Sequence, residues 1–185
     1  MALYVAKITC RTVEIDLRHK PAHLIRVSPK ATVPVLCLSN GEVIDESIDI
    51  MHWALAQHDP LGWLDRAHEP VAQRLLAQTD GPFKQALDQY KYSSRFMDLD
   101  PAQARAQAMA ALIDPLAEVL SHQPFIGGER ASLHDVAIFP FVRQFAGVQL
   151  DWFESDVPTT VQAWLSQWVE SSLFKTIMQK APKPA

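Results

Sequence analysis

The chain has 185 residues, of which 48 % are hydrophobic and 21 % charged, so it holds enough apolar side chains for one large domain or two small ones. Its formal charge is −4, without a stripe of lysine and arginine, which argues against nucleic acid as a partner. No window reaches the 18 or so consecutive apolar residues of a membrane span, and the N-terminal stretch lacks the features of a secretory signal; we therefore expect a cytoplasmic protein that binds no membrane.

The first third of the chain begins with two short predicted elements. Residues 10–17 alternate apolar and polar side chains, which is typical of a strand. Residues 20–27 follow, with Pro21 at a suitable first helical position. Cys10 opens the predicted strand and has no CxxC or CxxH pattern around it, so nothing indicates a disulfide framework or a zinc site.

A hairpin and a helix are predicted next. The apolar run 33–38 indicates a buried strand, in which Cys37 is expected to be an inert core residue. Asn40 and Gly41 favour a hairpin turn with positive φ angles, which leads into a return strand at residues 43–44. A helix is predicted from Glu46 onward because apolar residues then recur at helical spacing, at Ile48, Met51 and Leu55.

The residue pattern of the sequence changes after this helix. Pro60, Gly62 and Pro70 all disfavour a continuous helix, and we interpret residues 59–69 as a linker. Beyond it there is no strand candidate, and apolar residues recur at helical spacing. The sequence thus predicts an α+β chain in two parts, a strand-containing unit over residues 1–58 and an all-helical unit over residues 70–180.

Several signals within the helical part are specific. Gly81-Pro82 predicts a kink in the first long helix, and Pro115 predicts a bend in the second. Ser132 and Asp135 have the spacing of a capping box, which serves folding rather than catalysis. The seven histidines are scattered, and His52 and His134, which lie on predicted helices, have no HxxxH or partner pattern, so no metal site is predicted. Two more helices are expected around 161–168 and 173–178, and residues 180–185 form a tail.

Val33-Pro34 directly precedes an apolar strand. A trans proline that merely begins the strand is the simpler interpretation of these two residues. A cis peptide bond is the alternative, since X–Pro bonds adopt it most readily. In that case the backbone N–H and C=O of Val33 would turn outward, where they can pair with an extended peptide.

Asp45, Glu46 and Ser47 open the predicted helix. The free N–H groups and the dipole of a helix start attract carboxylates, and a serine hydroxyl adds a donor. Simple helix capping is the alternative, because all three residue types are favoured at such positions.

Two stretches together carry a resemblance to a known family. They are S-P-K-A-T-V-P-V-L at residues 28–36, followed by a hairpin and D-E-S at 45–47, and F-I-G-G-E-R-A-S-L-H-D-V-A-I-F-P-F-V-R-Q-F-A at 125–146. The order and spacing of these motifs are similar to those of the glutathione S-transferase family, and the match covers most of the chain. Lys20, in R-H-K-P, is similar to a lysine that contacts glutathione in the omega-like branch of that family.

The resemblance implies a thioredoxin-like first domain and a helical second domain, with glutathione bound as substrate or ligand between them. It implies that Val33 pairs through its backbone with the cysteinyl unit and that Pro34 is the cis-proline that permits this. It also implies that Glu46 and Ser47 hold the γ-glutamyl end, while Lys20 contacts the tripeptide. A solvated surface lysine is the alternative interpretation of Lys20.

The start of the sequence departs from the family pattern. Family members begin with a strand, a loop carrying the catalytic Cys, Ser or Tyr, and a helix, whereas only residues 1–9 precede the predicted strand here. The match places Met1 inside the first helix, so the first domain is expected to be incomplete. Three outcomes stay open: a longer natural protein, a second strand that pairs directly with the third, or a strand formed by residues 2–6 in place of the helix.

No catalytic residue is predicted. Cys10 and Cys37 are thiols, and Tyr4 and Thr9 carry hydroxyls, but no spacing supports any of them as a nucleophile. The leading hypothesis is glutathione transfer to an unknown small electrophile, or disulfide reduction, provided that the missing segment exists. The alternative is a non-catalytic interaction or regulatory protein on the same fold.

The resemblance also implies a homodimer. Four aromatic residues of the helical part are candidates for the lining of an electrophile pocket, and they are expected to be packing residues instead. These residues are Tyr90, Tyr92, Phe96 and Trp152.

Overall fold

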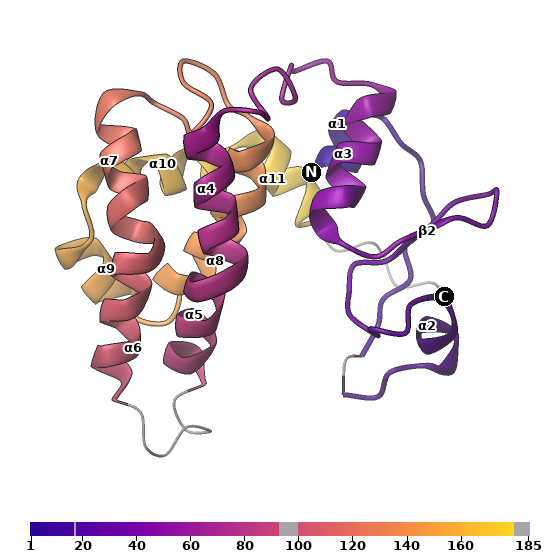
Figure 1. Cartoon of the computed structure of the whole chain (residues 1–185), viewed down its shortest axis with the longest axis horizontal. Helices are drawn as coiled ribbons and strands as arrows, with labels where there is room; N and C mark the ends of the chain where they lie inside the picture. The colour runs from indigo at the N-terminus through magenta and orange to yellow at the C-terminus, as the bar shows by residue number, and fades with distance from the viewer. Residues whose placement is uncertain (17, 93–99, 180–185) are drawn as a thin grey trace. The chain divides into compact units, whose positions relative to one another are not determined.

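The computed structural model describes residues 1–16, 18–92 and 100–179. They form two compact units, Met1–Leu64 and a second unit that begins at Asp65. The first unit contains three helices and a two-stranded sheet. Its elements are α1 (Ala2–Val5), α2 (Ala22–Val27), β1 (Leu36–Cys37), β2 (Val43–Ile44) and α3 (Ser47–Gln57) (Figure 1).

The hairpin forms at the predicted place. β1 and β2 pair antiparallel, with Leu36 opposite Ile44. Gly41 has a φ of +88°, which glycine adopts without a steric penalty. Asn40 contributes differently from the prediction: its φ is not positive, and its side-chain Oδ1 accepts a hydrogen bond from the Glu42 N–H at 3.0 Å. The strand is shorter than predicted and is not buried, because Cys37 is exposed.

The start of the chain is helical. α1 packs against α3, and the contact buries Ala2 and Val5 of α1 together with Ile50, Ala54 and Leu55 of α3. This agrees with the expected alignment of Met1 within a helix. The open alternative, a strand over residues 2–6, is wrong.

The strand predicted at residues 10–17 is also wrong. Residues 10–16 have no regular secondary structure, residue 17 lies outside the described residues, and Val13 is 52 % exposed. Alternation of side chains only marks two faces, whereas a strand also needs a partner for its backbone groups, and no described strand lies beside this segment. At the end of this segment, the Asp16 carboxylate accepts a hydrogen bond from the Arg18 N–H at 2.9 Å.

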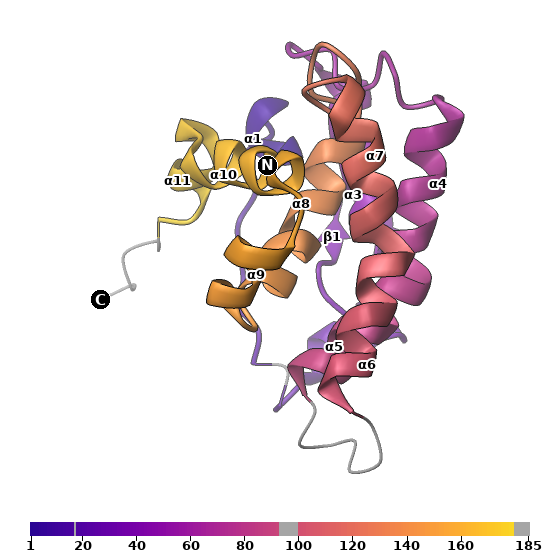
Figure 2. The same ribbon diagram turned by 90° about the vertical axis from the view of Figure 1, so that its left-hand side faces the viewer.

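The second unit is entirely helical in the part that the structure describes (Figures 1 and 2). Its first two long helices are each interrupted by a π-helical turn, and α5 packs beside α6. The elements are α4 (Pro70–Gln78), η1 (Thr79–Phe83), α5 (Lys84–Lys91), α6 (Pro101–Ala108), η3 (Met109–Ile113), α7 (Asp114–His122), α8 (Leu133–Ala146), α9 (Leu150–Asp156), α10 (Thr159–Glu170) and α11 (Ser172–Ile177).

The predicted kink at Gly81-Pro82 is confirmed. Gly81 has φ −103° and ψ −105°, outside the helical region, and Pro82 lies within η1. The second interruption, η3, ends just before Pro115, which agrees with the predicted bend. A proline removes one helical N–H and crowds the preceding turn, which accounts for an interruption of the regular α-helix beside each of these prolines.

α8 lies at the centre of the helical unit and contacts α4, α5 and α10. The predicted capping box is present at its start, formed by Ser132 and Asp135. Phe139 stacks on Trp168 with ring centroids 5.5 Å apart, and Phe145 is completely buried. α9 follows α8 and was not predicted. Across the described ranges, every helix is too short or too polar to cross a membrane.

Candidate functional site

The N-terminus of α3 carries a cluster of polar side chains. Glu46 is the N-cap residue and Ser47 the first helical residue, and both are exposed. The Glu46 side chain makes no capping hydrogen bond. The capping interpretation of this residue is therefore wrong, and its carboxylate is available to another group.

That carboxylate has a partner from a distant part of the chain. Lys30 Nζ lies 2.5 Å from Glu46 Oε1 and 3.4 Å from Asp45 Oδ1. All three side chains remain accessible, with exposed fractions of 56 % for Lys30, 53 % for Glu46 and 27 % for Asp45. The hydrogen bond to Glu46 raises the pKa of Lys30 above its ordinary value. One lysine between two carboxylates leaves a net charge of −1, which favours a further cation.

Asp45 is fixed from its other side. Its Oδ2 accepts a hydrogen bond from the Ser28 hydroxyl at 2.9 Å, and Ser28 is only 1 % exposed. This hydrogen bond lowers the pKa of the Asp45 carboxyl, and the charge of Lys30 lowers it further. The Ala31 N–H donates to the Ser28 carbonyl at 2.8 Å, so a tight turn over residues 28–31 is held against the start of α3.

Val33 and Pro34 follow this turn directly. Their peptide bond is cis, so the trans alternative is wrong. Val33 is 44 % exposed, and neither its N–H nor its C=O has a hydrogen-bond partner among the residues that the structure describes. A free donor and a free acceptor on one exposed residue are what an extended peptide needs for strand-like pairing.

The remaining site residue of the sequence analysis stands apart from this cluster. Lys20 is exposed just before α2 and makes no hydrogen bond or ion pair with any described residue. Sequence reasoning missed the roles of Ser28 and Lys30, which stand in the S-P-K string that was used only as part of a resemblance. Their spacing from Asp45 carries no local signal, because the contacts span 15 to 17 residues.

The candidate nucleophiles are all at the surface. Cys10 and Cys37 are free, exposed thiols, so the expected burial of Cys37 is wrong. Among the described residues, its strand pairs with β2 alone, and Cys37 lies opposite Val43 in this hairpin. Tyr4 is 57 % exposed. Nothing in the geometry marks any of them as activated, and no group of three metal-binding side chains occurs within the described ranges.

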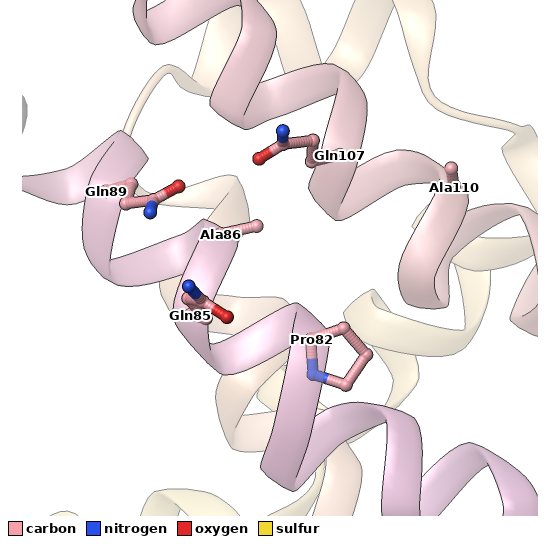
Figure 3. Close-up of a pocket in the computed structure, with 6 residues that line it drawn as sticks. All are labelled: Pro82, Gln85, Ala86, Gln89, Gln107 and Ala110. Carbon is pink, nitrogen blue, oxygen red and sulfur yellow. The ribbon is translucent and has the colours of Figure 1, made fainter. Parts of the chain in front are cut away.

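A concave feature lies in the helical unit. It encloses about 480 Å³ between η1–α5 and α6–η3. Figure 3 shows Gln85 and Gln89 on one helix and Gln107 on the other, around a floor that includes Ala86. The described residues of the lining offer amide donors and acceptors but no charge, which does not suit an anionic tripeptide.

Tyr90 and Trp152, two of the aromatic candidates for an electrophile pocket, are not among the residues that line this cavity. Tyr90 is buried, and its hydroxyl donates to Gln149 Oε1 at 3.2 Å. Trp152 packs edge-on against Phe145, with the Arg105 guanidinium 4.2 Å from its ring centroid. These two residues act in packing, as expected, while Phe96 lies outside the described residues.

Comparisons with known proteins assign segments of both units to one family. Residues 1–57 match the family model "Glutathione S-transferase, N-terminal domain", and residues 85–167 match "Glutathione S-transferase, C-terminal domain". Glutathione S-transferase L3 of Arabidopsis thaliana is 29 % identical over 163 residues, which is 86 % of this chain. The chain spans 65 % of the length of that relative.

Solved structures show the same architecture. One is the glutathione transferase URE2P6 of Phanerochaete chrysosporium in complex with oxidised glutathione, with a TM-score of 0.77, 18 % identity and coverage of 95 % of this chain and 86 % of that one. Another is a sphingomonad glutathione S-transferase complexed with glutathione, with a TM-score of 0.71, 19 % identity and coverage of 95 % and 88 %. At such identities the likeness establishes the fold, and it confirms the predicted fold class: a thioredoxin-like first domain followed by a helical second domain.

Proposed function

Because the chain belongs to the glutathione S-transferase family, we propose that its first unit binds glutathione at the start of α3 and at Val33. One observation carries this proposal. The exposed helix start with Glu46 and Ser47 is joined, through the Lys30 and Ser28 contacts, to the turn that precedes the unpaired backbone of Val33. A carboxylate, free helical N–H groups and a peptide-pairing residue are thus offered within one short region.

Each part of glutathione has a matching group. The α-ammonium of the γ-glutamyl end is assigned to the Glu46 carboxylate, and the adjacent α-carboxylate to the first-turn N–H groups of α3 and the Ser47 hydroxyl. The cysteinyl unit pairs with the N–H and C=O of Val33, next to Pro34. Lys20 supplies positive charge for the anionic tripeptide, the role that the omega-like resemblance implies.

Transfer of the glutathione thiol to a small electrophile, or reduction of a disulfide, is the proposed reaction of the whole protein. A homodimer and a cytoplasmic location belong to the same proposal. No catalytic residue is assigned. A non-catalytic binding protein is the second candidate, favoured by the observation that the thiols of Cys10 and Cys37 are exposed and make no hydrogen bond with any described residue.

Isothermal titration calorimetry with glutathione tests the binding site. We expect binding that Glu46→Gln weakens about tenfold, the effect of losing roughly 1.4 kcal/mol of charge-assisted hydrogen bonding. Glu14→Gln is the matched control, because Glu14 is exposed in the same unit and has no partner among the described residues. The absence of binding at millimolar glutathione, or equal affinity in Glu46→Gln, would contradict the proposal.

Activity measurements separate the two functional candidates. The wild-type chain is assayed with a chlorodinitrobenzene for thiol transfer and with a mixed disulfide for reduction. Cys10→Ser and Cys37→Ser show whether either thiol takes part. Turnover that saturates with glutathione supports the transferase, whereas tight glutathione binding without turnover supports the binding protein.

A further inference from the structure

The proposed glutathione site already contains a cation. Lys30 Nζ is closer to Glu46 Oε1 than to any other acceptor, at 2.5 Å, so the carboxylate assigned to the ligand's ammonium group is occupied in the free protein. Both side chains are more than half exposed, and a ligand can reach them. A second ammonium group at Glu46 must therefore share the carboxylate with Lys30 or displace it.

We propose that Lys30 is a specificity-determining residue of this site, which competes with the ligand's ammonium group for Glu46 and so weakens the preference for ligands that carry an amino group. The inference rests on the proposed glutathione site. Lys30 is not assigned to any part of glutathione. Its effect is exerted through Glu46, and the ligand class concerned is γ-glutamyl peptides and their analogues.

The structure provides a place for the displaced lysine. Asp45 Oδ1 already lies 3.4 Å from Lys30 Nζ, and the Ser28 hydroxyl holds Asp45 in position through its other oxygen. Lys30 can thus leave Glu46 and still keep one ionic partner. Its four-carbon side chain is flexible and half exposed, so the exchange requires no backbone movement.

Competition at Glu46 predicts the direction in which removal of Lys30 changes the affinity for each ligand. A ligand with an α-ammonium group gains the Glu46 contact only after Lys30 has been displaced, whereas a ligand without that group leaves the Lys30–Glu46 pair intact. Removal of Lys30 frees Glu46 and should tighten binding of the ammonium-bearing ligand alone. A general loss of positive charge would instead weaken binding of any anionic ligand.

The experiment compares two ligands and four proteins by calorimetry. The ligands are glutathione and its desamino analogue, in which a glutaryl group replaces the γ-glutamyl group. The proteins are the wild type, Lys30→Gln, Lys30→Arg and Arg26→Gln. Arg26 is a charge-matched control, since it is exposed in the same unit and has no partner among the described residues.

We expect Lys30→Gln to bind glutathione about threefold more tightly than the wild type, as fits the loss of one exposed competing ion pair. Its affinity for the desamino analogue should not increase. Lys30→Arg keeps the competing charge and should behave as the wild type, and Arg26→Gln should not tighten glutathione binding.

Glutathione binding that is unchanged or weaker in Lys30→Gln overturns the role of Lys30 while leaving the glutathione site in place. Equal tightening of both ligands overturns it as well, because competition at Glu46 affects only the ammonium-bearing ligand. If neither the wild type nor any variant binds glutathione at millimolar concentration, the site and the role of Lys30 fail together.

Discussion

Replacement of Asp135 by asparagine should strongly destabilise the helical unit. The Asp135 carboxylate is completely buried and accepts five hydrogen bonds. Its Oδ1 accepts from the Ile126 N–H at 2.8 Å and from the Trp164 indole N–H at 2.9 Å. Its Oδ2 accepts from the Gly127 N–H at 3.1 Å, from the Ser132 N–H at 2.8 Å and from the Ser132 hydroxyl at 2.9 Å.

The size of the effect follows from counting donors. Asparagine has nearly the same shape, but one of its two terminal atoms is an NH₂ group that cannot accept a hydrogen bond. If this group takes the place of Oδ1, two N–H donors lose their acceptor. If it takes the place of Oδ2, the Ser132 hydroxyl can rotate to accept, and two N–H donors are again orphaned. At about 1–3 kcal/mol for each buried unsatisfied donor, the expected loss is about 2–6 kcal/mol.

Urea unfolding followed by far-ultraviolet circular dichroism measures this loss. Asp114→Asn is the control, because Asp114 is exposed in the first turn of α7 and should change the free energy of unfolding by no more than about 0.5 kcal/mol. Trp164→Phe removes a single donor and should cost less than Asp135→Asn. A loss below about 1 kcal/mol in Asp135→Asn would refute the argument that this carboxylate holds the loop, the α8 start and α10 together.

Two further predictions concern local geometry and pH. Gly127→Ala should destabilise by about 2 kcal/mol, because a Cβ there would lie 2.6 Å from the Arg130 carbonyl oxygen. At Gly147 an added Cβ would lie 3.4 Å from its nearest neighbour, so Gly147→Ala should change the free energy of unfolding by no more than about 0.5 kcal/mol in the same urea measurement. Equal losses in the two variants would contradict the steric reason. The pKa of Asp45 is lower in the folded protein than its ordinary value of about 3.9. The ionised carboxylate therefore stabilises the folded state at pH values above the ordinary pKa, and this stabilisation is lost as the pH falls through the pKa of the folded state. Ser28→Ala should raise the Asp45 midpoint in an NMR titration, and an unchanged midpoint would exclude the Ser28 hydrogen bond as its main cause.

Local signals in the sequence predicted the helical unit well. The kink at Gly81-Pro82 and the capping box at Ser132 and Asp135 were both confirmed. Each depends on residues within a few positions of one another, because a proline acts on the preceding turn and a cap on the following one. The sequence also separated a strand-containing part from a helical part, since hydrophobic periodicity needs no knowledge of distant contacts.

The predictions failed where a partner decides the structure. Residues 10–16 alternate like a strand, but without a neighbouring strand among the described residues they stay irregular. Cys37 stands in an apolar run and was expected to be buried, yet the two-stranded sheet leaves it exposed. Strand propensity describes how well a side chain fits a pleated, half-buried surface, and it has little effect where that surface is absent.

The residues of the candidate site differ in the same way, between those with a local signal and those whose role depends on distant contacts. Glu46 and Ser47 could be placed at a helix start from local spacing, whereas Ser28 and Lys30 act on Asp45 and Glu46 across 15 to 17 residues. The same long-range contacts decide the chemistry of the site, because they fix one carboxylate and occupy the other. A substitution in the turn at residues 28–31 should therefore alter ligand choice at α3 without touching the helix itself.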